Sequence, residues 1–183
     1  MKLDGFYDQT RGGISLKACV RPRSKAEIRK IAARLRKITG FEETKKFPIV
    51  QFIEWIIGDP DGEYNFEIVG LSEMDDKYAV TDLKAGIIKI REDVYKRAIE
   101  GSPRDLFTLF HEVGHFVLHP PGEVMFARGD VPAYQDPEWQ ANCFAAELMA
   151  PYSLARGMSA EQIVENFGMS LQAAMIRSKE CAN

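Results

Sequence analysis

The pattern with the clearest chemical meaning is HEVGH, at residues 111–115. Side chains four residues apart share one face of a helix, so His111 and His115 can bind the same metal ion. Imidazole nitrogen is a common zinc ligand, and a glutamate between two such histidines serves as the general base that activates water. The spacing therefore predicts a zinc-peptidase site, with His111 and His115 as metal ligands and Glu112 as the catalytic residue.

The flanking residues predict a helix from about Pro103 to Leu118 that carries this motif. Ser102 is a favourable N-cap, Pro103 suits the first helical position, and Pro120 and Pro121 end the helix. At about 100° per residue, the helix has an apolar side and a polar side. The apolar side holds Leu106, Leu109, Phe110, Val113, Phe116 and Val117. The polar side holds His111, Glu112, His115 and His119.

A catalytic zinc site needs a third protein ligand and an open position for water. The next predicted helix begins at Asp136 and Pro137, and it offers Glu138 in its first turn. Glu147 is the alternative ligand, but the helix periodicity places it on the side expected to face solvent. We therefore predict Glu138 as the third ligand. Small residues let this helix approach another backbone closely: Ala141 and Ala145.

His119 is the third histidine of the chain, and it lies in the same segment. In the longer H-E-x-x-H-x-x-G-x-x-H pattern, a third histidine ligand follows a glycine and lies further downstream. His119 comes too early for that pattern. We expect it to cap the helix or to line the cleft, with direct ligation as the alternative.

Two blocks of sequence resemble a known family. The segment HEVGHFVLH at 111–119 is similar to the H-E-L-G-H-x-x-L-H signature of the ImmA/IrrE metallopeptidases, and EWQANCFAAELMAP at 138–151 is similar to the second block of that family. The stretch before the zinc helix also resembles the family, and the likeness covers about residues 24–180. Leu106 and Phe110 depart from the family pattern without touching a proposed ligand, so substrate selection is what they could alter.

The resemblance implies a fold, a metal site and a substrate. It implies zinc held by His111, His115 and Glu138, with Glu112 as base. Asn142, on the same predicted helix as Glu138, is a separate candidate to orient Glu138 or a histidine. The resemblance also implies an endopeptidase that cleaves an intracellular regulator, in particular a helix-turn-helix repressor encoded beside it in a mobile element or stress operon. The alternative is a non-proteolytic zinc protein that regulates a transcription factor, antitoxin or toxin by binding it. This ligand set also accepts manganese or nickel.

Composition predicts a single compact domain. The chain has 183 residues, of which 45% are hydrophobic, and three cysteines with no metal-binding or disulfide spacing: Cys19, Cys143 and Cys181. There is no apolar stretch long enough to span a membrane and no signal peptide, so we expect a cytoplasmic protein. We divide the domain 1–183 into an extension at 1–23, a peptidase core at 24–151 and a helical closure at 152–183. The oligomeric state is left open.

Charge is distributed unevenly along the chain. Residues 1–50 hold thirteen Lys/Arg and five Asp/Glu, whereas residues 51–183 hold eleven and twenty-two. The basic part centres on a predicted amphipathic helix at 24–40, whose apolar positions are Ile28, Ile31, Leu35 and Ile38. Nucleic-acid binding by this helix is a third hypothesis, but no base-reading motif accompanies it, and a solvated helix face is the favoured interpretation.

The remaining pattern predicts an α+β fold, with a small twisted sheet packed against the helical core. Further helices are expected at 47–57, 92–100, 159–167 and 170–179, and strands at 64–71, 78–83 and 87–91. The last two helices resemble helix-turn-helix geometry, but we interpret them as closing the fold. Residues 120–135 are expected to form a loop at the rim of the site. Tyr95 and Tyr134 are candidates to stabilise the oxyanion formed during peptide hydrolysis.

Overall fold

The computed structural model describes residues 8–11, 14–57, 65–83, 85–120 and 122–182, which form an α+β fold. Its helices are α1 (Lys25–Ile38), α2 (Ile49–Phe52), α3 (Glu92–Ile99), α4 (Pro103–Leu118), α5 (Pro137–Met149), α6 (Tyr152–Ala155), α7 (Ala160–Phe167) and α8 (Leu171–Glu180), with the short turns η1 (Ile53–Ile57, a π-helix), η2 (Leu71–Glu73) and η3 (Ala133–Gln135). Its strands are β1 (Asp8–Arg11), β2 (Ile14–Cys19), β3 (Asn65–Val69), β4 (Ala79–Asp82), β5 (Ile87–Arg91) and β6 (Met125–Arg128). No helix among these is long and apolar enough to cross a membrane.

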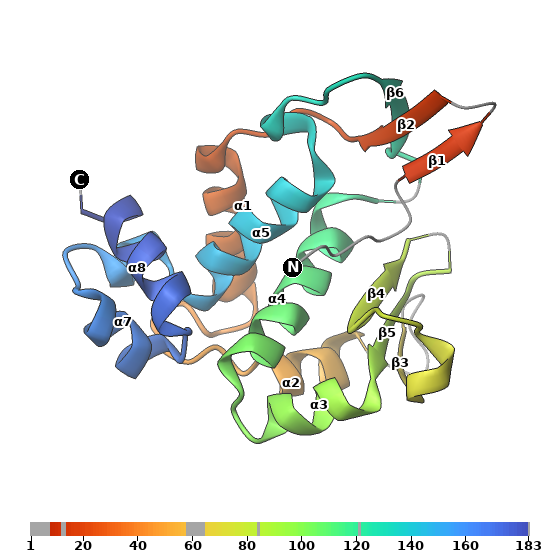
Figure 1. Ribbon diagram of the computed structural model, residues 1–183. Helices are drawn as coiled ribbons and strands as arrows, with labels where there is room; N and C mark the ends of the chain where they lie inside the picture. Colours follow the sequence, from red (N-terminus) through yellow and green to blue (C-terminus); the bar gives the residue numbers. More distant parts are fainter. Residues whose placement is uncertain (1–7, 12–13, 58–64, 84, 121, 183) are drawn as a thin grey trace.

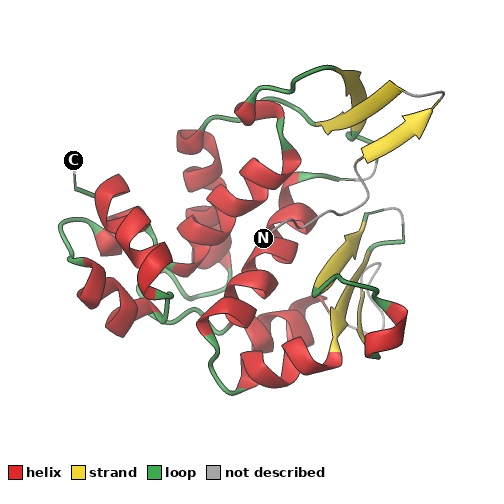
Figure 2. Ribbon diagram, in the orientation of Figure 1, coloured by secondary structure: helices red, strands yellow, loops and turns green. Residues whose placement is uncertain are grey.

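The helix that carries HEVGH runs through the middle of the molecule. Helix α4 lies between α5 and the β3–β5–β4 sheet, and α1 packs on α5 (Figure 1). Helices α7 and α8 lie at the opposite end of the molecule from the strands (Figure 2). The predicted start of α4 is confirmed, with Ser102 at the N-cap and Pro103 in the first turn.

Two three-stranded sheets form where the sequence predicts one. Strand β5 pairs with β3 in parallel and with β4 in antiparallel orientation, so among the described residues β4 is an edge strand. The buried side chains of β5, Ile88 and Ile90, belong to the core beneath α4. In the second sheet β2 pairs with β6, from Leu16 opposite Arg128 to Cys19 opposite Met125. The 120–135 segment is therefore partly strand, and the prediction of a simple loop there is wrong.

The basic helix α1 begins with a capping box at Ser24. Ser24 accepts from the Glu27 amide at 3.3 Å, and the Glu27 carboxylate accepts from the Ser24 amide at 2.7 Å. Its buried face differs from the prediction, because Ile38 is 71% exposed whereas Arg36 is 1% exposed. Arg36 donates to the carbonyl of Leu148 at 2.7 Å. This guanidinium is thus bound inside the protein and is not part of a surface for nucleic acid.

Helices α4 and α5 cross at Gly114. A Cβ at this position would lie 3.0 Å from the carbonyl oxygen and 3.1 Å from the Cα of Ala141. Both contacts are with backbone atoms, which cannot rotate away, so only glycine allows the two helices to approach this closely. The sequence expectation that a small residue at position 141 permits close approach is confirmed, and Gly114 is its partner.

Gly114→Val is expected to destabilise the protein by about 1–3 kcal/mol, since overpacking forces the two helices apart. The movement would also separate Glu138 on α5 from the histidines on α4, and should weaken metal binding. Thermal unfolding and metal content measure the two effects. Gly70→Ala is the matched control, since the nearest contact of its added Cβ is a flexible Glu73 side chain at 3.4 Å. Unchanged stability in Gly114→Val would contradict the close crossing.

Candidate metal centre

Three side chains predicted as metal ligands converge between α4 and α5. Nε2 of His111 and Nε2 of His115 lie 2.9 Å apart, and each lies 3.3 Å from a carboxylate oxygen of Glu138. In a tetrahedral zinc site with bonds of about 2.0–2.2 Å, two ligand atoms are about 3.4 Å apart. The spacing of the three groups therefore fits one zinc ion.

The helix side that carries the histidines is not a solvent-facing side. His111, Glu112 and His115 are 1%, 4% and 5% exposed. Helix α5 covers this side of α4, and Glu138 is the partly exposed member of the group, with its side chain 30% exposed. A metal ion bound here would be reached past Glu138.

The charges of the group favour a dication. Burial alone would raise the pKa of Glu138, but the neighbouring imidazoles of His111 and His115 lower it to about 2, so this side chain is a carboxylate at neutral pH. Burial alone would likewise lower the pKa of His111, but the neighbouring carboxylates of Glu138 and Glu112 raise it. One anionic oxygen and two imidazole nitrogens are the donor set of a metallopeptidase zinc site.

A polar side chain on α5 orients His111. Oδ1 of Asn142 lies 3.1 Å from Nδ1 of His111. A carbonyl oxygen can only accept, so Nδ1 of His111 carries the hydrogen and its Nε2 presents a lone pair toward Glu138. The sequence expectation that Asn142 orients a ligand agrees with this contact.

Glu112 is held by a residue that the sequence analysis missed. The hydroxyl of Thr81 lies 2.7 Å from Oε2 of Glu112 and 3.1 Å from its backbone carbonyl. Thr81 is 7% exposed and lies on the edge strand β4. The alternation of β4 could have indicated that Thr81 faces the interior. Only the packing of β4 on α4 identifies Glu112 as its partner.

Glu147, the alternative ligand, does not join the group. It is 6% exposed, so the prediction that it faces solvent is wrong. Its carboxylate lies 2.7 Å from Nη2 of Arg177 and 3.1 Å from Nε of Arg29, and it accepts from the Tyr152 amide. Glu147 thus joins α5 to α8 and α1 in a buried ion-pair network.

The two tyrosines predicted as oxyanion candidates lie in different surroundings. The hydroxyl of Tyr95 donates to Glu54, and its ring stacks on Phe66. Burial and this hydrogen bond raise the pKa of Tyr95 to about 12. These contacts lie with η1 and β3, away from α5. Tyr134 is 51% exposed on η3, immediately before α5, so it is the better placed of the two.

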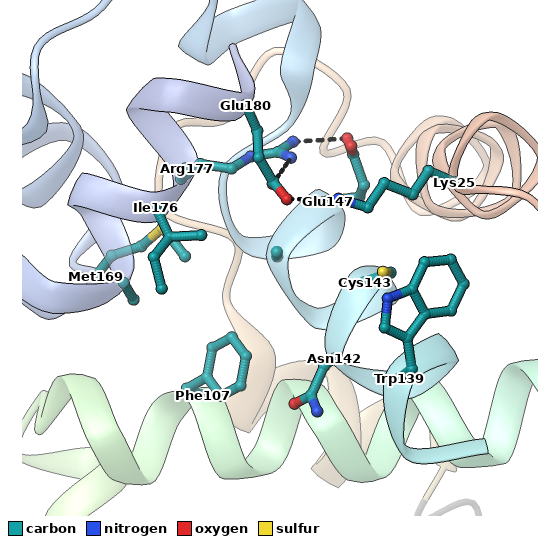
Figure 3. A pocket seen from close by; sticks show the side chains of 12 residues that line it. Lys25, Phe107, Trp139, Asn142, Cys143, Glu147, Met169, Ile176, Arg177 and Glu180 are labelled. Atoms are coloured by element: carbon teal, nitrogen blue, oxygen red, sulfur yellow. Dashed lines mark hydrogen bonds and ion pairs between the residues drawn. The ribbon is translucent and has the colours of Figure 1, made fainter. Parts of the chain in front are cut away.

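A cavity of about 270 Å³ adjoins the site along α5. Figure 3 shows Asn142 and Phe107 at one end, with Arg177, Glu147, Glu180 and Lys25 at the other. The charged groups are paired, since Lys25 lies 2.7 Å from Glu180. Cys143 lines the cavity, and burial raises the pKa of its thiol to about 11, so it is not a nucleophile at neutral pH.

Part of the chain matches a known family of peptidases. Residues 92–179 match the family model for the IrrE N-terminal-like domain, Peptidase_M78. The match begins at α3 and ends in α8, so it contains HEVGH, Glu138 and both terminal helices. Curated proteins and solved structures gave no significant match. The matched segment carries both sequence blocks and the converging groups, and over these residues the chain is similar to the IrrE N-terminal-like domain of the peptidase family.

Proposed function

We propose that the protein is a zinc-dependent endopeptidase that regulates transcription by cleaving a DNA-binding repressor. The observation that carries the proposal is the convergence of His111, His115 and Glu138, beside a glutamate held by Thr81. This is the donor set and the base of a metal-assisted hydrolysis. The residues fit the metal by charge, by spacing and by the orientation of His111.

Each residue of the site has a definite task in this mechanism. Zinc, when bound, supplies the Lewis acidity that makes water a nucleophile near neutral pH and polarises a peptide carbonyl. Glu112 accepts the proton of the attacking water and later transfers it to the leaving amine nitrogen. Thr81 fixes the Glu112 side chain by donating to one of its oxygens, which leaves the other to hold the proton.

An extended substrate can enter along β4. Within the described part of the chain, this strand pairs only with β5, so its other edge can add a peptide strand. Ala79 and Thr81 are the buried positions of β4, and Thr81 contacts Glu112. A peptide paired with this edge would pass beside the catalytic base.

The charge of the chain suits a basic substrate. Residues 51–183, which contain the site, have twice as many Asp/Glu as Lys/Arg. DNA-binding repressors carry basic surfaces that contact phosphates, and opposite charge accelerates the encounter of two proteins. A helix-turn-helix repressor therefore agrees both with the family resemblance and with the acidity of this region.

Incubation with helix-turn-helix repressors encoded in the same genome tests the proposal. The purified protein, loaded with zinc, should convert the repressor into defined fragments that mass spectrometry identifies, and 1,10-phenanthroline should stop the reaction. A stable complex without fragments would instead support regulation by binding. If the mixture gives no fragments and no complex, the repressor tested is not the partner.

Thr81→Val is expected to lower kcat about 10–100-fold, since a hydrogen bond to a charged group contributes about 1.5–3 kcal/mol. The substitution keeps the shape of the side chain and removes its hydroxyl, so zinc content and KM should stay near their wild-type values. Thr81→Ser, which restores a hydroxyl, should recover most of the loss. Equal kcat in Thr81→Val and wild type would show that Thr81 does not position Glu112.

A further inference from the structure

The third histidine has a buried contact that the proposed mechanism does not use. His119 is the C-cap of α4, one turn beyond His115, and its side chain is fully buried. Its Nδ1 lies 3.1 Å from Nδ1 of His115. The remaining ring nitrogen of His119, Nε2, lies 3.3 Å from Oε1 of Gln140 on α5. His115 is therefore connected to α5 through two side chains.

The orientation of the Gln140 amide is determined by its other contacts. Its Nε2 donates to two backbone carbonyls, of Arg21 and of Tyr134, at 2.8 Å each. Carbonyl oxygens only accept, so the nitrogen of the amide must be on this side. The atom that faces His119 is consequently the oxygen, which accepts. Gln140 is fully buried, and the sequence expectation that its side of α5 faces solvent is wrong.

The same reasoning extends from Gln140 to the metal site. Nε2 of His119 must carry the hydrogen that Oε1 of Gln140 accepts, and a neutral imidazole carries only one. Nδ1 of His119 is then an acceptor, so Nδ1 of His115 must be the donor across 3.1 Å. In neutral His115 the lone pair is therefore on Nε2, which faces His111 and Glu138.

We infer that Gln140 and His119 are positioning residues, which hold His115 in its Nδ1–H tautomer so that Nε2 is ready to bind the metal. The assignment of the tautomer rests on the hydrogen bonds alone, whereas its effect on metal affinity also rests on the proposed function. A direct role of His119 as a ligand is not needed. The two histidine ligands are thus oriented from α5 by separate routes, His111 through Asn142 and His115 through His119 and Gln140.

The tautomers can be read in the metal-free protein. With three histidines in the chain, long-range ¹H–¹⁵N correlation spectra of ¹⁵N-histidine-labelled protein resolve each ring, and single substitutions assign them. The expected result is Nδ1–H for His115 and Nε2–H for His119. Nε2–H for His115 in the wild type would overturn the inference, whether or not any variant folds.

Substitutions at His119 separate this role from simple packing. His119→Phe keeps a planar ring but removes the acceptor, and should return His115 to the Nε2–H tautomer. It should also weaken zinc binding about 10–100-fold, as loss of a partner hydrogen-bonded to a ligand does. His119→Asn restores an oxygen near the Nδ1 position and should recover the tautomer and most of the affinity. Competition with a chromophoric chelator measures the zinc affinities.

Asn142→Leu is the matched control, because it should change the tautomer of His111 and leave that of His115 unchanged. If His119→Phe and His119→Asn lose zinc affinity equally, His119 acts only by packing and the inference fails. A wild type that shows the expected tautomers but binds no zinc would retain the hydrogen-bond relay and reject the proposed function. A wild type that binds zinc, but whose metal-free form has His115 as the Nε2–H tautomer, would retain the proposed function and reject the hydrogen-bond relay.

Discussion

Glu138→Gln is expected to leave the protein folded and to remove its zinc. The carboxylate is the only anionic group in the converging set, and an amide oxygen is a much weaker zinc ligand. Its side chain is 30% exposed and contacts His111 and His115, while its backbone amide is capped by Asp136, so the helix does not depend on its charge. Elemental analysis after dialysis should give about one zinc per chain in the wild type and almost none in the variant.

Glu165→Gln is the appropriate control for this experiment, since that glutamate is exposed on α7. Chelator competition in place of dialysis extends the measurement to weakly bound metal. Stoichiometric zinc in Glu138→Gln, with affinity equal to that of the wild type, would contradict the assignment of Glu138 as a ligand. Absence of zinc in the reconstituted wild type would contradict the site as a whole.

Glu147→Gln should give a different result from Glu138→Gln. The substitution removes the more buried of the two carboxylates that pair with the guanidinium of Arg177, the other being Glu180. Breaking a buried pair costs up to about 3–5 kcal/mol. Zinc content should be unchanged in the folded protein, while the midpoint of thermal unfolding falls. Loss of zinc without loss of stability would instead restore Glu147 as the alternative ligand.

Glu112→Gln is expected to lower kcat/KM about 10²–10⁴-fold, the usual contribution of a positioned acid–base group. Glutamine has nearly the shape of glutamate but cannot take a proton from water at neutral pH. Its carbonyl oxygen can still accept from Thr81, so the local structure should be preserved. Zinc content should also be preserved, because Glu112 is outside the converging group of ligands.

The repressor cleavage assay measures this effect, with Glu165→Gln again as the control. The Glu112→Gln variant loses the base for hydrolysis but keeps the metal ligands. It should therefore still bind the repressor and hold it as a stable complex. If Glu112→Gln cleaves the repressor as fast as the wild type, the proposed mechanism is wrong. If it regulates transcription as well as the wild type does, the protein acts by binding and not by proteolysis.

The local part of the site could be predicted because it depends on helix geometry. Residues 111 and 115 lie one turn apart on any α-helix, and Ser102, Pro103 and the prolines at 120 and 121 define where that helix begins and ends. The same is true of Asp136, Pro137 and Glu138 at the start of α5. Prediction failed where one helix has more than one packed face. The basic side of the first helix was expected to be a solvated face, and helix periodicity placed Glu147 toward solvent. Arg36 and Glu147 are instead buried, each against a partner distant in sequence.

The sequence by itself determined the chemistry: two histidines and a glutamate in one helical turn, a second helix that begins with a carboxylate, and a resemblance that names the family. Only the tertiary structure decided how these groups are held. The pairs Thr81–Glu112, His119–Gln140 and Glu147–Arg177 join residues 31, 21 and 30 positions apart in the sequence. No helical or strand period connects such positions. They meet because Gly114 lets α5 cross α4 closely and because β4 packs on the other side of α4, and both are results of burying the common core.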